Sequence, residues 1–189
     1  MSPSFTINSS DAAAGLTVSD SGRQLTFASG ASYRGARSVE TRAGGLVMAT
    51  FWTDPMGAAW ATDESSVGFA NSSHVLTAGV NGPNQVTYSP GGKVWQNGGV
   101  LATYAAWQKG SRIDAVWDFG NSKVYFRADE GSWNNSGAAN PATNTGGLSV
   151  TLAGTLYALI SLYSTVDQRC RSALYIPTTG PVGITFPWG

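Results

Sequence analysis

Short segments rich in β-branched and aromatic residues recur along the chain, separated by clusters of glycine, asparagine, serine and proline. This pattern predicts many short β-strands, and no long segment shows the helical period of about 3.6 residues. We expect strands at residues 15–19, 24–28, 45–52, 66–70, 85–88, 93–96, 100–104, 112–119, 123–128, 148–152, 155–163 and 182–186. So many short strands, with turn signals roughly every 8–12 residues, predict an all-β fold, an antiparallel two-sheet β-sandwich.

Two hairpins can be assigned from the turn residues between neighbouring strands. The strand at 112–119 returns through Gly-Asn-Ser into the strand at 123–128. The strand at 85–88 returns through Ser-Pro-Gly-Gly into the strand at 93–96. Both turns consist of residues that tolerate a positive φ or preset a bend, so we expect both strand pairs to be antiparallel.

The alternation along 123–128 indicates which face of the sheet is buried. Val124 and Phe126 point to one side, while Lys123, Tyr125 and Arg127 point to the other. We therefore expect one face in the core and one face in water.

Composition narrows the class of protein. Charged residues make up 12% of the 189 residues, and 11 Lys+Arg balance 11 Asp+Glu at a pI near 6.5. This lack of basic charge argues against nucleic acid and membrane surfaces as partners. We expect one domain over residues 1–189, with residues 1–8 as an N-terminal arm. No signal peptide or apolar span is visible, which predicts synthesis in a cytoplasm without a secretion signal, as for a virion protein released by lysis, and no membrane insertion.

Candidate catalytic and metal-binding groups are sparse. One cysteine, Cys170, and one histidine, His74, allow no disulfide and no Cys/His zinc site, and we expect no metal and no other cofactor. His74 lacks an accompanying nucleophile motif, and we expect it to be solvated or hydrogen-bonded. A carboxylate pair formed by Asp54 with Asp63 or Glu64 is the one enzymatic alternative, a glycoside hydrolase. We predict a protein that is not an enzyme and has no catalytic residues.

Two tryptophans stand in loop or turn regions beside polar side chains. Trp60 lies in a long segment without strand pattern, and Trp95 leads into a hairpin turn. Aromatic faces beside amides and carboxylates suit sugar recognition. The candidate ligand-binding residues are Trp60, Asp63, Trp95, Gln96 and Asn97, whereas Trp52, Trp107, Trp117 and Trp133 are expected to serve in packing.

The second half of the chain resembles a known family. Residues 109–126, KGSRIDAVWDFGNSKVYF, resemble the core of the SPRY domain, in which a strand ending in Asp turns into a K-V-x-F strand. Residues 140–147, NPATNTGG, and 156–163, LYALISLY, are similar to segments of SPRY-like domains in bacteriophage structural proteins. The chain departs from the family at Ser111, where Asp is common, and at Asp114, where Gly is common.

The resemblance implies a bent, lectin-like β-sandwich that binds rather than catalyses. It predicts a surface protein of a phage-like virion, either a capsid-decorating or a fibre-associated subunit, with other virion proteins and host glycans as partners. We also expect a homo-oligomer. The alternative is a free-standing, lectin-like glycan-binding module. Transfer of function from fold alone is analogy, so the site has to be argued from residues.

Overall fold

The computed structural model describes residues 6–27, 32–55, 60, 63–163 and 168–175; within 168–175 only the side chain of Cys170 is described.

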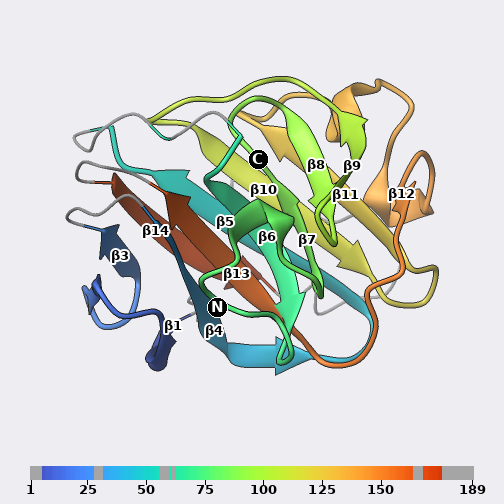
Figure 1. Cartoon of the computed structure of the whole chain (residues 1–189). Helices are drawn as coiled ribbons and strands as arrows, with labels where there is room; N and C mark the ends of the chain where they lie inside the picture. The colour runs from blue at the N-terminus through green and yellow to red at the C-terminus, as the bar shows by residue number, and fades with distance from the viewer. Residues whose placement is uncertain (1–5, 28–31, 56–59, 61–62, 164–167, 176–189) are drawn as a thin grey trace.

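Two seven-stranded antiparallel sheets are stacked face to face (Figure 1). The first sheet has the strand order β1 (Ile7–Ala12), β4 (Tyr33–Arg42), β13 (Leu156–Tyr163), β6 (Ser66–Asn71), β7 (Gln85–Tyr88), β8 (Lys93–Gln96) and β9 (Gly99–Thr103). The second has the order β12 (Leu148–Ser149), β11 (Lys123–Ala128), β10 (Arg112–Asp118), β5 (Leu46–Thr53), β14 (Gln168–Tyr175), β3 (Gln24–Phe27) and β2 (Leu16–Ser19). The all-β sandwich is therefore confirmed.

Both predicted hairpins form. β10 pairs with β11 in a continuous antiparallel register from Ile113 opposite Ala128 to Asp118 opposite Lys123. β7 pairs with β8, with Tyr88 opposite Val94. Local turn chemistry was sufficient here because each pair is formed by consecutive segments of the chain.

The core lies between the sheets and is built from the inward side of each strand. Ile113, Val124 and Phe126 are completely buried there, as the alternation predicts. Aromatic rings link the two layers. The ring of Tyr88 in the first sheet lies 5.4 Å from that of Phe126 in the second, measured between centroids.

The prediction that the outer side of the β10–β11 hairpin faces water is wrong. Tyr125 and Val116 point away from the main core, yet both are completely buried. They form a second apolar cluster with Met48, Trp133 and Ala139, the last two from the segment that follows β11. Alternation reports which residues share a face, but it does not reveal that a later segment covers that face.

Three strands are absent from the sequence prediction: β1, β4 and β14. Their sequences, INSSDA, YRGARSVETR and QRCRSALY, are rich in charged and small polar residues that rarely mark a strand. The expected strand at 182–186 lies outside the described residues.

The expected N-terminal arm over residues 1–8 is too long. Ile7 is 3% exposed and begins β1, where its N–H donates to the carbonyl of Gly22. Thr6 is held by Glu40, whose carboxylate accepts bonds from the N–H and hydroxyl of Thr6. The part of the proposed arm that starts at residue 6 thus belongs to the fold, and residues 1–5 lie outside the described part.

The outer face of the first sheet is partly covered by the segment between β6 and β7. This segment includes the 3₁₀ turn η1 (Gly79–Asn81), which contacts β4, β8 and β13. Gly79 adopts φ +60°, and a Cβ there would fall on the ring of Tyr33. The cover leaves β9, at the far edge of the sheet, exposed.

Candidate functional site

Trp60, the first of the candidate ligand-binding residues, lies in the core. Its side chain is 6% exposed, and its ring packs edge-on against that of Trp107 at 5.3 Å between centroids. A ring buried in this way presents no face for a ligand to stack on. The expected packing roles of Trp107 and Trp117 agree with their burial, at 5% and 1% exposed.

Trp95 and Asp63 come together on the outer face of the first sheet. Alternation along β8 turns Val94 and Gln96 inward and leaves Lys93 and Trp95 outward. Asp63 reaches this face from the segment between β5 and β6, and Ser89 follows β7 directly. We call Asp63, Ser89, Lys93 and Trp95 the Trp95 cluster.

Hydrogen bonds and an ion pair fix the Trp95 cluster. The indole N–H of Trp95 donates to Ser89 Oγ at 3.3 Å, and Lys93 Nζ lies 2.6 Å from Asp63 Oδ2. Lys93 Nζ is also 5.7 Å from the centroid of the Trp95 ring, within reach of a cation–π contact. The side chains of Asp63 and Lys93 are 34% and 39% exposed, so a ligand can reach their charged atoms. The cluster offers a half-buried aromatic ring beside an internally neutralised charge pair.

Gln96 and Asn97 do not join this cluster. Gln96 is 8% exposed and faces the segment before β13; with its amide oxygen turned toward that segment, the oxygen accepts from the N–H groups of Thr151 and Leu152 at 2.8 and 3.2 Å. Asn97 has φ +51° in a two-residue turn with Gly98, and its Oδ1 accepts from the N–H of Asn84. Both amides therefore serve the fold at the opposite end of β8 from Lys93.

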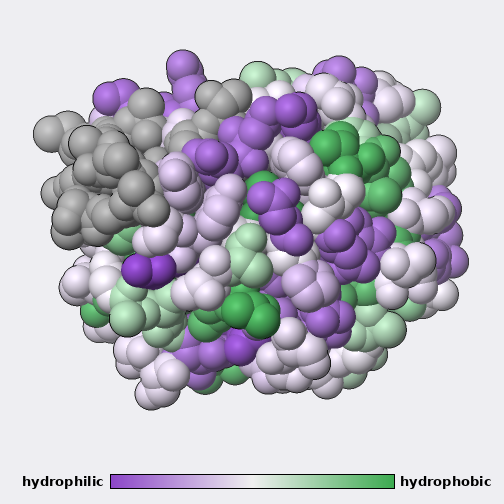
Figure 2. Space-filling model, in the orientation of Figure 1, coloured by the Kyte–Doolittle hydropathy of each residue, from purple (hydrophilic) through white to green (hydrophobic). Residues whose placement is uncertain are grey.

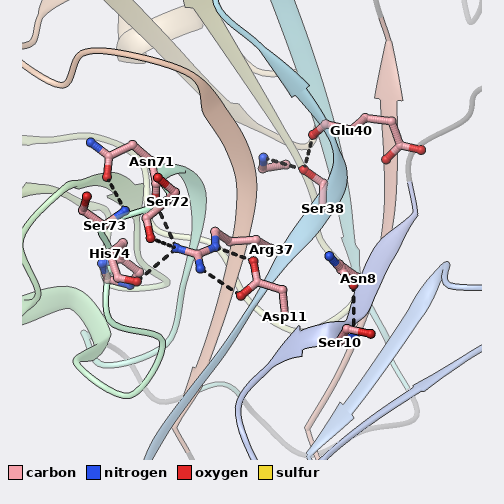
Figure 3. A network of polar contacts seen from close by, with 11 residues as sticks. Asn8, Ser10, Asp11, Arg37, Ser38, Glu40, Asn71, Ser72, Ser73 and His74 are labelled. Carbon is pink, nitrogen blue, oxygen red and sulfur yellow. Dashed lines mark hydrogen bonds and ion pairs between the residues drawn. The ribbon is translucent and has the colours of Figure 1, made fainter.

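A buried arginine network holds the N-terminal strand (Figure 3). The guanidinium of Arg37 binds both carboxylate oxygens of Asp11, at 2.7 and 2.8 Å, and Nη1 donates to the carbonyls of Asn71, Ser72 and His74. These bonds join β1 and β4 to the turn after β6. Because these partners accept the N–H groups of the Arg37 guanidinium, we interpret the network as a structural link between strands rather than a ligand site.

His74 and Cys170 are both buried. His74 is 4% exposed, and its Nδ1 lies 2.8 Å from the carbonyl oxygen of Pro83. Burial lowers the pKa of His74, which favours the neutral ring, and burial raises the pKa of the Cys170 thiol, which disfavours the nucleophilic thiolate. Among the described residues, no group of three or more His, Cys, Asp or Glu side chains is arranged to hold a metal ion.

A second charged network, missed from the sequence, lies on the outer face of the second sheet. Asp114 is 1% exposed and accepts bonds from Thr50 Oγ1 at 2.8 Å, Arg112 Nε at 3.1 Å and Arg127 Nε at 2.9 Å. The Arg127 guanidinium lies 4.4 Å from the centroid of the Trp133 ring. The signal in the sequence was the departure from the family pattern at Asp114, because a carboxylate in place of glycine requires partners.

A groove of about 300 Å³ opens at one end of the sandwich. Its lining includes Trp117 of β10, Phe119 just after β10 and the segment 152–155 before β13. That lining contains no charged or amide side chain among the described residues, so nothing in it selects a ligand chemistry. No helix in the described part of the chain is long and apolar enough to cross a bilayer.

Comparisons with known proteins show which known fold this chain is similar to. No protein-family model and no curated protein matches the sequence. Among solved structures, the SPRY domain of human HERC1 aligns with a TM-score of 0.66 at 16% identity, over 88% of this chain and 96% of that domain. A human SPRY domain aligns at 0.60 and 11% identity, over 90% and 96% of the two chains, and the TRIM65 PSpry domain at 0.60 and 10%, over 89% and 88%. At such identities the likeness establishes architecture alone, and on that measure this chain has the SPRY fold.

Proposed function

We propose that this chain is a non-enzymatic binding module of a phage-like particle surface, and that it contacts its ligand through the Trp95 cluster. The observation that carries the proposal is a tryptophan ring fixed on an outer sheet face by Ser89, beside the exposed Asp63–Lys93 ion pair. A virion location is supported by the resemblance of residues 140–147 and 156–163 to SPRY-like domains of phage structural proteins.

Neutral glycans are the ligand class that this chemistry favours. An indole face packs against the apolar C–H side of a pyranose, and a carboxylate and an ammonium group accept and donate bonds to its hydroxyls. Asp63 and Lys93 compensate each other, so the site has no strong net charge to attract a charged ligand. A non-enzymatic role is supported by the burial of His74 and the Cys170 thiol.

Replacing Trp95 by alanine should lower glycan binding at least about tenfold, which corresponds to about 1.4 kcal/mol. The ring supplies the stacking surface, and its half-buried position lets the variant fold. Binding is measured on an array of neutral glycans and confirmed by titration with one of the glycans that bind. Trp52→Ala is the matched control, because Trp52 is another half-buried tryptophan, in β5 of the other sheet.

Two results of this experiment would contradict the proposal. Equal glycan affinity of wild type and Trp95→Ala would show that the ligand binds outside the Trp95 cluster. The absence of binding to any glycan on the array would exclude neutral glycans as the ligand. Reducing ends released from a polysaccharide by wild type, but not by Asp63→Asn, would favour the glycoside hydrolase alternative.

The location is tested separately by co-sedimentation with particles. We expect the purified chain to pellet with particles and to remain bound at about 0.5 M salt, because a chain with no net charge docks through apolar and hydrogen-bonded contacts rather than screened charges. A variant lacking residues 1–5 reports whether that part of the arm contributes, because this deletion keeps Thr6 and its bonds to Glu40. A chain that binds glycans but never pellets with particles would be the free-standing lectin-like module.

A further inference from the structure

β9 is an exposed outer strand that is short and bulged but carries no charged side chain. It ends the first sheet, β8 is its one partner among the described strands, and Val100 and Leu101 are 47% and 41% exposed. Natural edge strands usually carry charges or proline that prevent pairing with another chain, and Gly99–Thr103 contains neither. Figure 2 shows the corresponding hydrophobic patch over β9.

The patch extends beyond the strand and stands apart from other exposed apolar residues. Ala105 and Ala106, which follow β9, are exposed as well. The other exposed large hydrophobic residues in the described part of the chain, Val39 and Val75, belong to other elements. Val100 and Leu101 are therefore the place where large apolar side chains are exposed side by side.

A β-bulge shapes this edge. Val94 lies opposite Ala102 and Trp95 lies opposite Val100, so Leu101 is the additional residue on β9. A bulge interrupts the regular backbone ladder, which makes long strand pairing less favourable. A partner at this edge is thus held chiefly by side-chain packing on Val100 and Leu101.

The charge distribution favours a second copy of this chain as that partner. Between Glu64 and Lys109 the sequence contains one charged residue, Lys93, and Asp63 neutralises it. Two copies with zero net charge experience no long-range repulsion, and a charge-free strand opposite its own symmetry mate places no like charges together. A two-fold contact is self-complementary and needs no second surface.

We propose that β9 is the interface of a two-fold dimer of this chain, with Val100 and Leu101 of each copy packed against those of the other. The proposal rests on this edge alone and does not require a glycan at the Trp95 cluster. The proposal names β9 as the surface through which the expected homo-oligomer forms.

The test is the mass of the full chain in solution across concentrations from about 1 to 200 μM, a range that brackets micromolar affinities. Sedimentation velocity of wild type should show a species of twice 19.6 kDa at the upper end. Leu101→Lys should raise the dimer dissociation constant at least about tenfold. Val75→Lys is the matched control, because it introduces the same lysine at an exposed apolar residue outside β9. The Val75→Lys variant should dimerise like wild type.

A cysteine replacement tests the geometry independently of stability. Leu101→Cys introduces an accessible thiol, whereas Cys170 is completely buried. Under mild oxidation L101C should form a covalent dimer, and V75C should not. A wild type that is monomeric throughout would overturn the proposal and point to a partner of different sequence. A dimer that is unaffected by Leu101→Lys and is not cross-linked at residue 101 would place the interface elsewhere.

Discussion

Replacing Phe126 by alanine should lower the free energy of unfolding by about 3–5 kcal/mol. Phe126 is completely buried at the middle of β11, opposite Ala115 of β10, and its ring packs against Tyr88 of the other sheet. The alanine variant loses this burial and leaves a cavity between two sheets that cannot both move in to fill it. Urea denaturation at 25 °C, analysed with a common m-value, measures the change.

Two companion variants make the Phe126 result specific. Phe126→Leu retains much of the volume and should cost clearly less than alanine. Val39→Ala alters a side chain that is 56% exposed and should change stability by no more than about 0.5 kcal/mol. If Phe126→Ala unfolded at the same urea concentration as Val39→Ala, this position would not be part of the core.

Replacing Asp114 by asparagine should destabilise the protein by about 3 kcal/mol, the lower part of the range for breaking a buried ion pair. Asparagine keeps the shape but removes the negative charge that faces Arg112 and Arg127, whose side chains are only 14% and 15% exposed. Arg112 retains Glu130 at 3.0 Å, which moderates the loss. The same urea titration at neutral pH measures the effect.

Asp63→Asn is the matched control for Asp114→Asn. It removes one carboxylate charge from an ion pair with Lys93, but that pair is far more exposed than the Asp114 pairs and should contribute no more than about 1 kcal/mol. A double-mutant cycle of Asp114→Asn with Arg127→Gln isolates the coupling between the two side chains. An Asp114 variant as stable as the Asp63 variant would show that burial adds nothing to this network.

The sequence predicted the sandwich and its local pairings because these depend on neighbouring residues. Alternation along 112–119 and 123–128, with a Gly-Asn-Ser turn between them, is sufficient to form a hairpin and to place Phe126 inside. The same reasoning missed β4, which is charged along much of its length. That strand is stable in the sheet because Arg37 finds Asp11 and three backbone carbonyls, partners distant in sequence.

For the candidate site too, some features could be predicted from the sequence and others depended on the tertiary structure. Alternation by itself separates Trp95 from Gln96, because successive residues of a strand point to opposite faces. That Asp63 lies beside Ser89 and Lys93, which in turn contact Trp95, depends on contacts between residues distant in sequence, and no sequence pattern records it. Likewise, the burial of Trp60 depends on Trp107, 47 positions later in the sequence.

The sequence by itself therefore determined the all-β class, two hairpins and the inward side of several strands, since the period of the side chains and the turn residues act locally. Only the tertiary structure decided which faces were covered, which charges were paired and which tryptophans remained partly accessible. Val116 and Tyr125 are buried because a segment folds back over them, and Val100 and Leu101 are exposed because no described segment covers them. Those outcomes depend on contacts between distant segments, which form only when the chain has folded.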